Sequence, residues 1–165
     1  MTNRTMQVFL ACMLAGAGAV AAPAADEASI ARGILDATGV KGGLIVHVGC
    51  GDGRLTAALC ASDSHLVHGL DTDAANVENA RRHIRSLGLY GKVSADRWDG
   101  ARLPYIDNLV NLIVSERPLD VAKEELLRVL RPDGIAYVKH RDGPARRFIL
   151  RSSAAAENGS LGEGA

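Results

Sequence analysis

An apolar run that ends in alternating glycines constrains this chain more than any other stretch. Residues 44–48 read Leu-Ile-Val-His-Val and are followed by Gly49, Gly51 and Gly53. A run that is apolar on both sides predicts a strand buried on both faces, as in a parallel sheet. Glycine adopts positive φ and lets a ligand lie against the backbone, so the glycines predict a tight turn into a helix near Arg54. Open α/β sheets bind ligands at such strand–loop–helix junctions.

A carboxylate stands at the end of the next apolar segment, residues 66–70. Asp71 lies twenty positions after Gly51, and an acid at about this distance typically accepts hydrogen bonds from ribose hydroxyls. A dinucleotide fingerprint starting at Gly49 needs a further glycine where this chain has Arg54. The spacing therefore favours a nucleoside without a pyrophosphate. A tight turn that binds nothing is the alternative that the glycines alone leave open.

Helical and strand patterns alternate from residue 26 to residue 140. We expect helices over 26–39, 54–61, 73–87 and 119–130, and strands over 44–48, 65–70, 91–95, 109–114 and 134–139. This alternation predicts an α/β fold with a doubly wound, Rossmann-like parallel sheet. In the helix over 73–87, four apolar residues recur at helical spacing and are expected to face the sheet, namely Val77, Ala80, Ile84 and Leu87.

Four motifs resemble those of class I S-adenosylmethionine-dependent methyltransferases, in the same order along the chain. They are residues 48–53, residues 69–73 with the helix after them, residues 94–96 followed by Leu-Pro-Tyr at 103–105, and residues 125–134. The resemblance implies the strand order 3-2-1-4-5 and S-adenosylmethionine as the cofactor. The family usually adds two more strands as an antiparallel hairpin. No pattern after residue 140 supplies them, so we expect a sheet that lacks these last two strands.

The resemblance also implies which residues hold the cofactor. The glycine loop approaches it through the backbone, Asp71 accepts the ribose hydroxyls, and Asp96 accepts the adenine amino group. The implied cofactor-binding residues are Gly49, Cys50, Gly51, Gly53, Asp71, Thr72, Asp96 and Arg97. Trp98 either stacks on a ring of the ligand or covers the core.

Two positions depart from the family pattern, and no catalytic residue is assigned. His47 stands where the family usually has an acidic residue, and Asn111 replaces another acid. Glu116 is a conceivable base, although a loop leading into a helix is the better interpretation. The leading hypothesis is a methyltransferase domain acting on a small-molecule acceptor. The alternative is a non-catalytic, exported module derived from a methyltransferase, which either binds S-adenosylmethionine or a nucleoside or has a structural role, alone or as part of a larger protein. A nicotinamide oxidoreductase is disfavoured by Arg54.

Composition and the N-terminal residues bear on partners and location. Lys and Arg total 19, as do Asp and Glu, so the balanced charge suggests no nucleic-acid partner. Arg4, a short apolar run and Ala-x-Ala sites predict a signal peptide over residues 1–25, too short for a stable membrane span. With such a signal the chain is exported, to the periplasm or outside the cell; without it the chain is cytoplasmic. No Cys/His spacing predicts a metal site.

The tail, residues 141–165, bears on the edge of the sheet. Residues 152–165 are rich in Ser, Ala, Gly and Glu and are expected to be disordered. A strand over 134–139 would expose an unpaired edge, which invites association unless something covers it. Residues 148–150 (Phe-Ile-Leu) are the apolar cluster of the tail, and we expect them to fold back there as a helix or a short strand.

Overall fold

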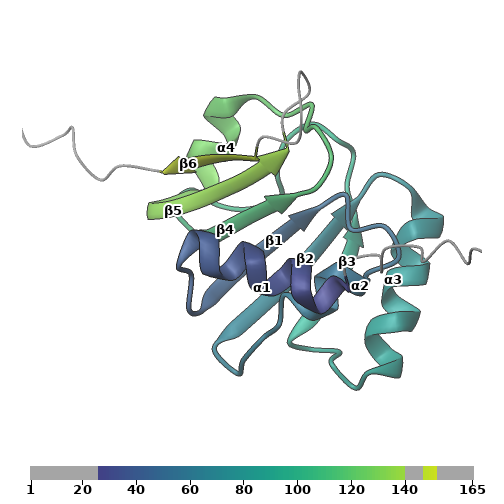
Figure 1. Cartoon of the computed structure of the whole chain (residues 1–165). Helices are drawn as coiled ribbons and strands as arrows, with labels where there is room; N and C mark the ends of the chain where they lie inside the picture. The colour runs from purple at the N-terminus through teal and green to yellow at the C-terminus, as the bar shows by residue number, and fades with distance from the viewer. Residues whose placement is uncertain (1–25, 140–146, 152–165) are drawn as a thin grey trace, which may run out of the picture.

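A six-stranded sheet runs through the middle of the structure (Figure 1). The computed structural model describes residues 26–139 and 147–151. The elements in chain order are α1 (Glu27–Thr38), β1 (Gly43–Val48), α2 (Arg54–Ala58), β2 (His65–Asp71), α3 (Ala74–Ser86), β3 (Val93–Arg97), β4 (Val110–Ser115), α4 (Lys123–Val129), β5 (Leu130–Lys139) and β6 (Arg147–Arg151). The strand order is β3-β2-β1-β4-β5-β6, and the first five strands are parallel. The predicted α/β class and the order 3-2-1-4-5 are confirmed.

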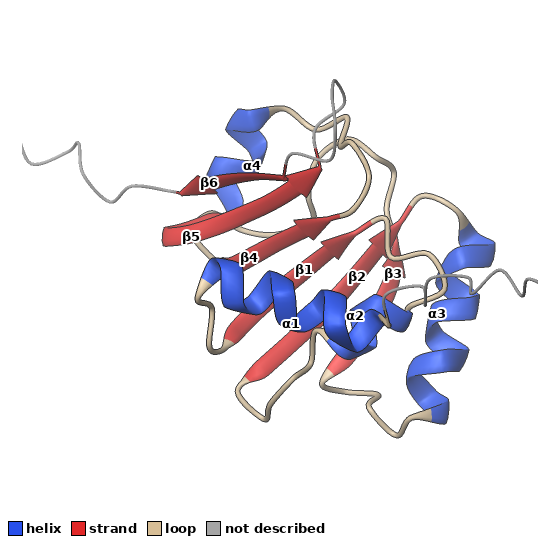
Figure 2. Ribbon diagram, viewed as in Figure 1, coloured by secondary structure: helices blue, strands red, loops and turns tan. Residues whose placement is uncertain are grey.

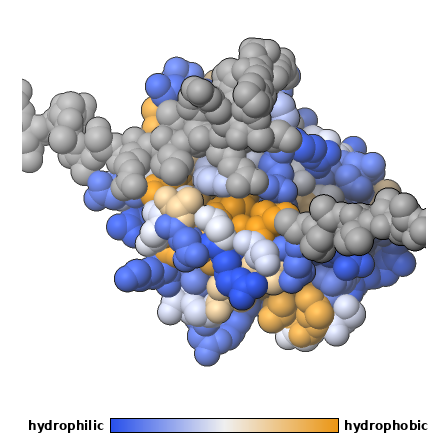
Figure 3. All heavy atoms as spheres, viewed as in Figure 1, coloured by the Kyte–Doolittle hydropathy of each residue, from blue (hydrophilic) through white to orange (hydrophobic). Residues whose placement is uncertain are grey.

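Helices cover both faces of the sheet (Figure 2). α1, α2 and α3 pack on one face, and α4 packs on the other together with the loop after β3. Within β1, Ile45 faces the first layer and Val46 the second, and both are fully buried. This burial on both faces explains why residues 44–48 are apolar without alternation. The described residues visible in Figure 3 are mostly hydrophilic, with small apolar areas between them.

α3 follows its predicted pattern except at its end. Val77, Ala80 and Ile84 are buried, as expected. Leu87, however, is 52% exposed, and the prediction that it faces the sheet is wrong. The helix ends at Ser86 and the chain turns at Gly88 with a φ of 68°. Leu87 therefore lies past the last turn that packs on the sheet.

α4 begins later than the sequence suggests, at Lys123 rather than at residue 119. Its first backbone hydrogen bonds run from Glu125 and Leu126 to the carbonyl of Ala122. β5 also differs, because it starts at Leu130, directly after the helix. The predicted turn over 132–134 is an irregularity inside this strand, where the register with β4 shifts.

At the edge formed by β5, the sheet differs from the expected fold. β6 pairs antiparallel with β5, with Tyr137 opposite Ile149. The sheet therefore has one antiparallel strand after the fifth, rather than none. The segment that supplies it contains residues 148–150, so the prediction that this cluster covers the edge as a short strand is confirmed.

Some predictions fall outside the described residues. The signal peptide over 1–25 and the disorder after residue 151 lie there and stay predictions. Within the described part of the chain, no helix has the length and apolar character needed to cross a membrane.

Candidate cofactor site

The glycine loop turns the chain from β1 into α2, and each of its glycines has its own reason. Gly49, Gly51 and Gly53 have φ values of 81°, 55° and 81°, a region that other residues adopt at a cost. A Cβ on Gly53 would lie 2.7 Å from the Cα atom of Ala80, so this glycine lets α3 pack closely. A Cβ on Gly51 would meet nothing within 4 Å. The backbone at Gly51 is therefore open to a ligand.

Asp71 ends β2 beside this loop, and its carboxylate is almost completely buried. Its Oδ2 accepts from the N–H of Gly51 at 2.9 Å and from Arg117 at 3.2 Å. Its Oδ1 accepts from the N–H of Asp73 at 3.0 Å and from Asn76 at 3.3 Å. The carboxylate therefore joins the glycine loop, the start of α3 and the segment after β4.

These contacts keep Asp71 ionised. Burial raises its pKa, but the hydrogen bonds from Asp73, Gly51 and Asn76 and the charge of Arg117 lower it by more. The net result is a pKa below the usual value for an aspartate. An ionised carboxylate at the carboxyl end of a parallel sheet is a strong acceptor for hydroxyl groups.

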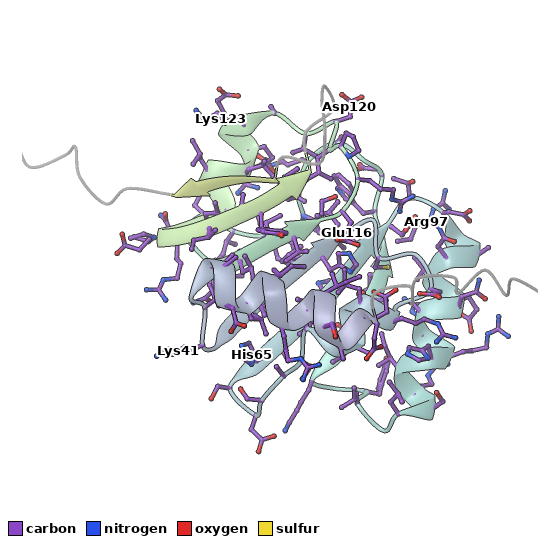
Figure 4. The ribbon with its side chains drawn as sticks, in the orientation of Figure 1. Lys41, His65, Arg97, Glu116, Asp120 and Lys123 are labelled. Atoms are coloured by element: carbon purple, nitrogen blue, oxygen red, sulfur yellow. The ribbon has the colours of Figure 1, made fainter. Side chains whose placement is uncertain are left out.

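A cavity of about 250 Å³ opens at the carboxyl ends of β1, β2 and β4. Its walls come from the glycine loop, the end of β2, the loop after β3, and the segment between β4 and α4. The lining residues are Val48, Gly49, Asp71, Thr72, Trp98, Gly100, Ser115, Arg117, Pro118, Leu119 and Asp120. In Figure 4, Glu116 and Asp120 lie toward this end of the sheet, whereas Lys41 and His65 lie at the opposite end.

The wall formed by the loop after β3 is fastened to α4. Arg128 donates to the carbonyls of Tyr105 and Leu103 and pairs with Asp107 and Glu125. Glu125 in turn accepts from the N–H of Leu103 at 2.8 Å. The loop that carries Trp98 and Gly100 into the cavity is thus held by a charged network.

The structure brings some of the predicted site residues together and separates others. Gly49, Asp71 and Thr72 line the cavity, and Cys50, Gly51 and Gly53 lie in the loop beside it. Asp96 instead pairs with Arg81 at 2.5 Å and with His68 at 3.0 Å, and Arg97 is exposed at the end of β3.

Asp96 and Arg97 do not line the cavity, whereas two residues that follow β3 do. β3 continues to Arg97, two residues past its predicted end. Trp98 and Gly100 therefore reach the site, and the Trp98 indole N–H donates to the carbonyl of Arg102 at 2.8 Å. No sequence pattern assigned Gly100 to the site, and the role of Trp98 was left open.

His47 and Cys50 have structural environments rather than reactive ones. Burial, together with the charge of Arg117, lowers the pKa of His47 to about 4, and its Nδ1 lies 2.8 Å from the Thr56 hydroxyl. His47 is therefore neutral near pH 7. Burial raises the pKa of the Cys50 thiol to about 12, so no thiolate forms there. Among the described residues, no group of three or more His, Cys, Asp and Glu could hold a metal ion.

Comparison with known proteins identifies the family. A family model described as a methyltransferase domain matches residues 45–134. The chain belongs to this methyltransferase domain family. The resemblance to class I S-adenosylmethionine-dependent methyltransferases is therefore confirmed, and S-adenosylmethionine is the cofactor expected for the domain.

Individual relatives agree with this assignment. Methyltransferase GfsG of Streptomyces halstedii is 34% identical over 96 residues, which cover 54% of this chain and 34% of GfsG. The [4+2]-cyclase SpnF is 26% identical with a TM-score of 0.61, over 68% of this chain and 44% of SpnF. Geranyl diphosphate C-methyltransferase of Streptomyces coelicolor A3(2), solved with S-adenosyl-L-homocysteine, shares the fold at 20% identity and a TM-score of 0.62, over 69% of this chain and 45% of that one.

The chain matches only part of these proteins. It spans about a third of the length of GfsG and less than half of each of the two structures.

Proposed function

We propose that this chain binds S-adenosylmethionine in the cavity at the ends of β1, β2 and β4 and transfers its methyl group to a small-molecule acceptor. The environment of Asp71 is the observation that carries the proposal. Its ionised carboxylate, with a side chain only 4% exposed, lines the cavity and bonds the N–H of Gly51. A nucleoside diol needs an acceptor of this kind, next to a backbone that a ligand can approach.

The residues present fit the parts of the cofactor. Gly49 and Gly51 offer bare backbone, and Asp71 offers the acceptor for the ribose hydroxyls. Trp98 and Gly100 form the wall on which the adenine would lie. No phosphate-binding fingerprint is required, because the cofactor carries none.

The cofactor supplies a methyl group on a positively charged sulfur, which is already a good leaving group. The chain therefore needs to align the acceptor and exclude water rather than provide a strong nucleophile. The segment between β4 and α4 forms the wall opposite the glycine loop through Ser115, Pro118 and Leu119. We assign this wall to the acceptor.

Calorimetric titration of the full chain with S-adenosylhomocysteine tests the proposal. We expect saturable binding, and no heat with NAD. Asp71→Asn should weaken binding by about 1.5–3 kcal/mol, the range for hydrogen bonds to a charged group. Asp63→Asn is the matched control, because Asp63 pairs with Lys92 at the opposite end of the sheet and should leave the affinity unchanged. Absence of binding to the folded wild-type chain refutes the proposed function.

A further inference from the structure

The guanidinium group of Arg117 lies against both the Gly49 backbone and the Asp71 carboxylate. Its terminal NH2 nitrogen lies 3.2 Å from Asp71 Oδ2. A Cβ built on Gly49 would lie 2.8 Å from the same nitrogen and 3.1 Å from Nε, so the guanidinium rests directly on the Gly49 backbone. These two surfaces, the bare glycine and the carboxylate, are the ones that a nucleoside would use.

Hydrogen-bond donors of the chain itself already occupy the acceptor positions of the Asp71 carboxylate. A carboxylate has about four lone-pair positions, two on each oxygen. Gly51 and Arg117 occupy those of Oδ2, and Asp73 and Asn76 occupy those of Oδ1. A ribose hydroxyl can therefore bond this carboxylate only in the position of a donor that leaves.

Arg117 is the donor that can leave most easily. The N–H groups of Gly51 and Asp73 belong to backbone fixed by the loop and by the start of α3, and Asn76 lies on α3. The Arg117 side chain is instead 60% exposed. Its carbonyl accepts from the Ser115 hydroxyl at 2.8 Å, which anchors the backbone while the long side chain borders solvent.

We propose that Arg117 is an internal competitor of the cofactor, holding the place of the ribose hydroxyls on Asp71 until a nucleoside displaces it. This inference rests on the proposed function, because it concerns the same site. Displacing Arg117 breaks an ion pair, so the pair lowers the affinity for any nucleoside that uses Asp71. Salt screens the exposed Arg117 charge and weakens the pair, so the competition ties affinity to ionic strength.

The test uses the full chain and 5′-methylthioadenosine, an uncharged nucleoside without the amino-acid end of the cofactor. Its affinity depends on whether the Arg117–Asp71 pair has to break. The nucleoside has no carboxylate of its own to which Arg117 could move. We expect Arg117→Ala to bind it about two- to fivefold more tightly than the wild type, the range for an ion pair whose arginine is exposed. Arg117→Met, which keeps an unbranched stem but has no donor for Asp71, should behave alike. Thermal melting shows that each variant is folded.

Arg54→Ala is the matched control. It removes the same charge from an exposed arginine beside the glycine loop, and Arg54 pairs with Asp52 rather than with Asp71. We expect this variant to bind with wild-type affinity. Raising the salt concentration should tighten nucleoside binding by the wild type and by Arg54→Ala, and not by Arg117→Ala.

The outcomes separate the two proposals. If the wild type binds S-adenosylhomocysteine and Arg117→Ala binds the neutral nucleoside no more tightly than the wild type, the competition is refuted and the proposed function stands. An equal gain in Arg54→Ala also refutes it, because the effect is then a general one of charge. If neither the wild type nor any variant binds either ligand, the proposed function fails as well.

Discussion

Lowering the pH from 7 to 5 should destabilise this chain through His47. His47 is buried, with 4% of its surface exposed, and its Nδ1 contacts the Thr56 hydroxyl. Its pKa is lowered from 6.5 to about 4. In the unfolded chain the same histidine has its ordinary pKa. Between pH 6.5 and pH 4 the unfolded state therefore binds more protons than the folded state. The stabilisation is complete above this window and is lost as the pH falls through it.

The expected loss follows from the two pKa values. A shift of one pKa unit corresponds to about 1.4 kcal/mol. At pH 5 the unfolded histidine is almost fully protonated, whereas the folded one is mostly neutral. The difference between pH 7 and pH 5 comes to about 2 kcal/mol, a large part of the ~5–15 kcal/mol that stabilises an ordinary domain. Asp71, whose pKa is lowered, stays ionised over this range.

Urea unfolding at the two pH values measures this effect. Trp98 is the single tryptophan of the chain and is 9% exposed, so its fluorescence reports unfolding. His47→Gln is the matched variant, because it can retain a hydrogen bond to Thr56 but cannot titrate. We expect the wild type to lose about 2 kcal/mol more than the variant between pH 7 and pH 5. Equal losses in both proteins would show that His47 does not cause the pH dependence.

Two further predictions concern stability. Gly53→Ala should cost at least about 1 kcal/mol more than Gly51→Ala by thermal or urea unfolding, because both strain the backbone but only the first drives a methyl group into α3. Equal costs contradict the packing role of Gly53. Deleting residues 144–165 should lower the melting temperature or cause aggregation, since it removes β6 and exposes the edge of β5, whereas deleting 152–165 should do neither. If both truncated chains melt like the full chain, β6 does not protect that edge.

Much of the fold follows from local features of the sequence. The continuous apolar run of β1 reflects burial on both faces, and Asp73 caps α3 by accepting from the N–H of Ala75 at 2.8 Å. The late start of α4 was not predictable in this way. Asp120 resembles a helix cap, but the structure places it in the cavity wall. A loop that serves a site and a loop that begins a helix use the same residue types.

The candidate site likewise contains residues that local sequence features predict and residues that they do not. Asp71 could be assigned from its distance to the glycine loop, because that distance is fixed by one strand–helix–strand unit. The structure places Asp96 within β3 rather than in the cavity wall, because the strand continues past residue 95 and pairing with β2 joins Leu70 to Asp96. Arg117 reaches Asp71 across 46 residues, and no local pattern indicates such a contact.

The position of the cavity between β1 and β4 has a consequence for the order of folding. One wall comes from residues 48–100, and the other comes from residues 115–120, beyond the loop that joins β3 to β4. The first three strands could assemble early, because their contacts are close in sequence, but they form only half of the cavity. Docking of β4 against β1 completes it and closes a long loop, as the hydrogen bond from Leu44 to Asn111 illustrates. A bound ligand would therefore act as a clamp across the two halves, and it would slow amide exchange in β4 as well as in the glycine loop.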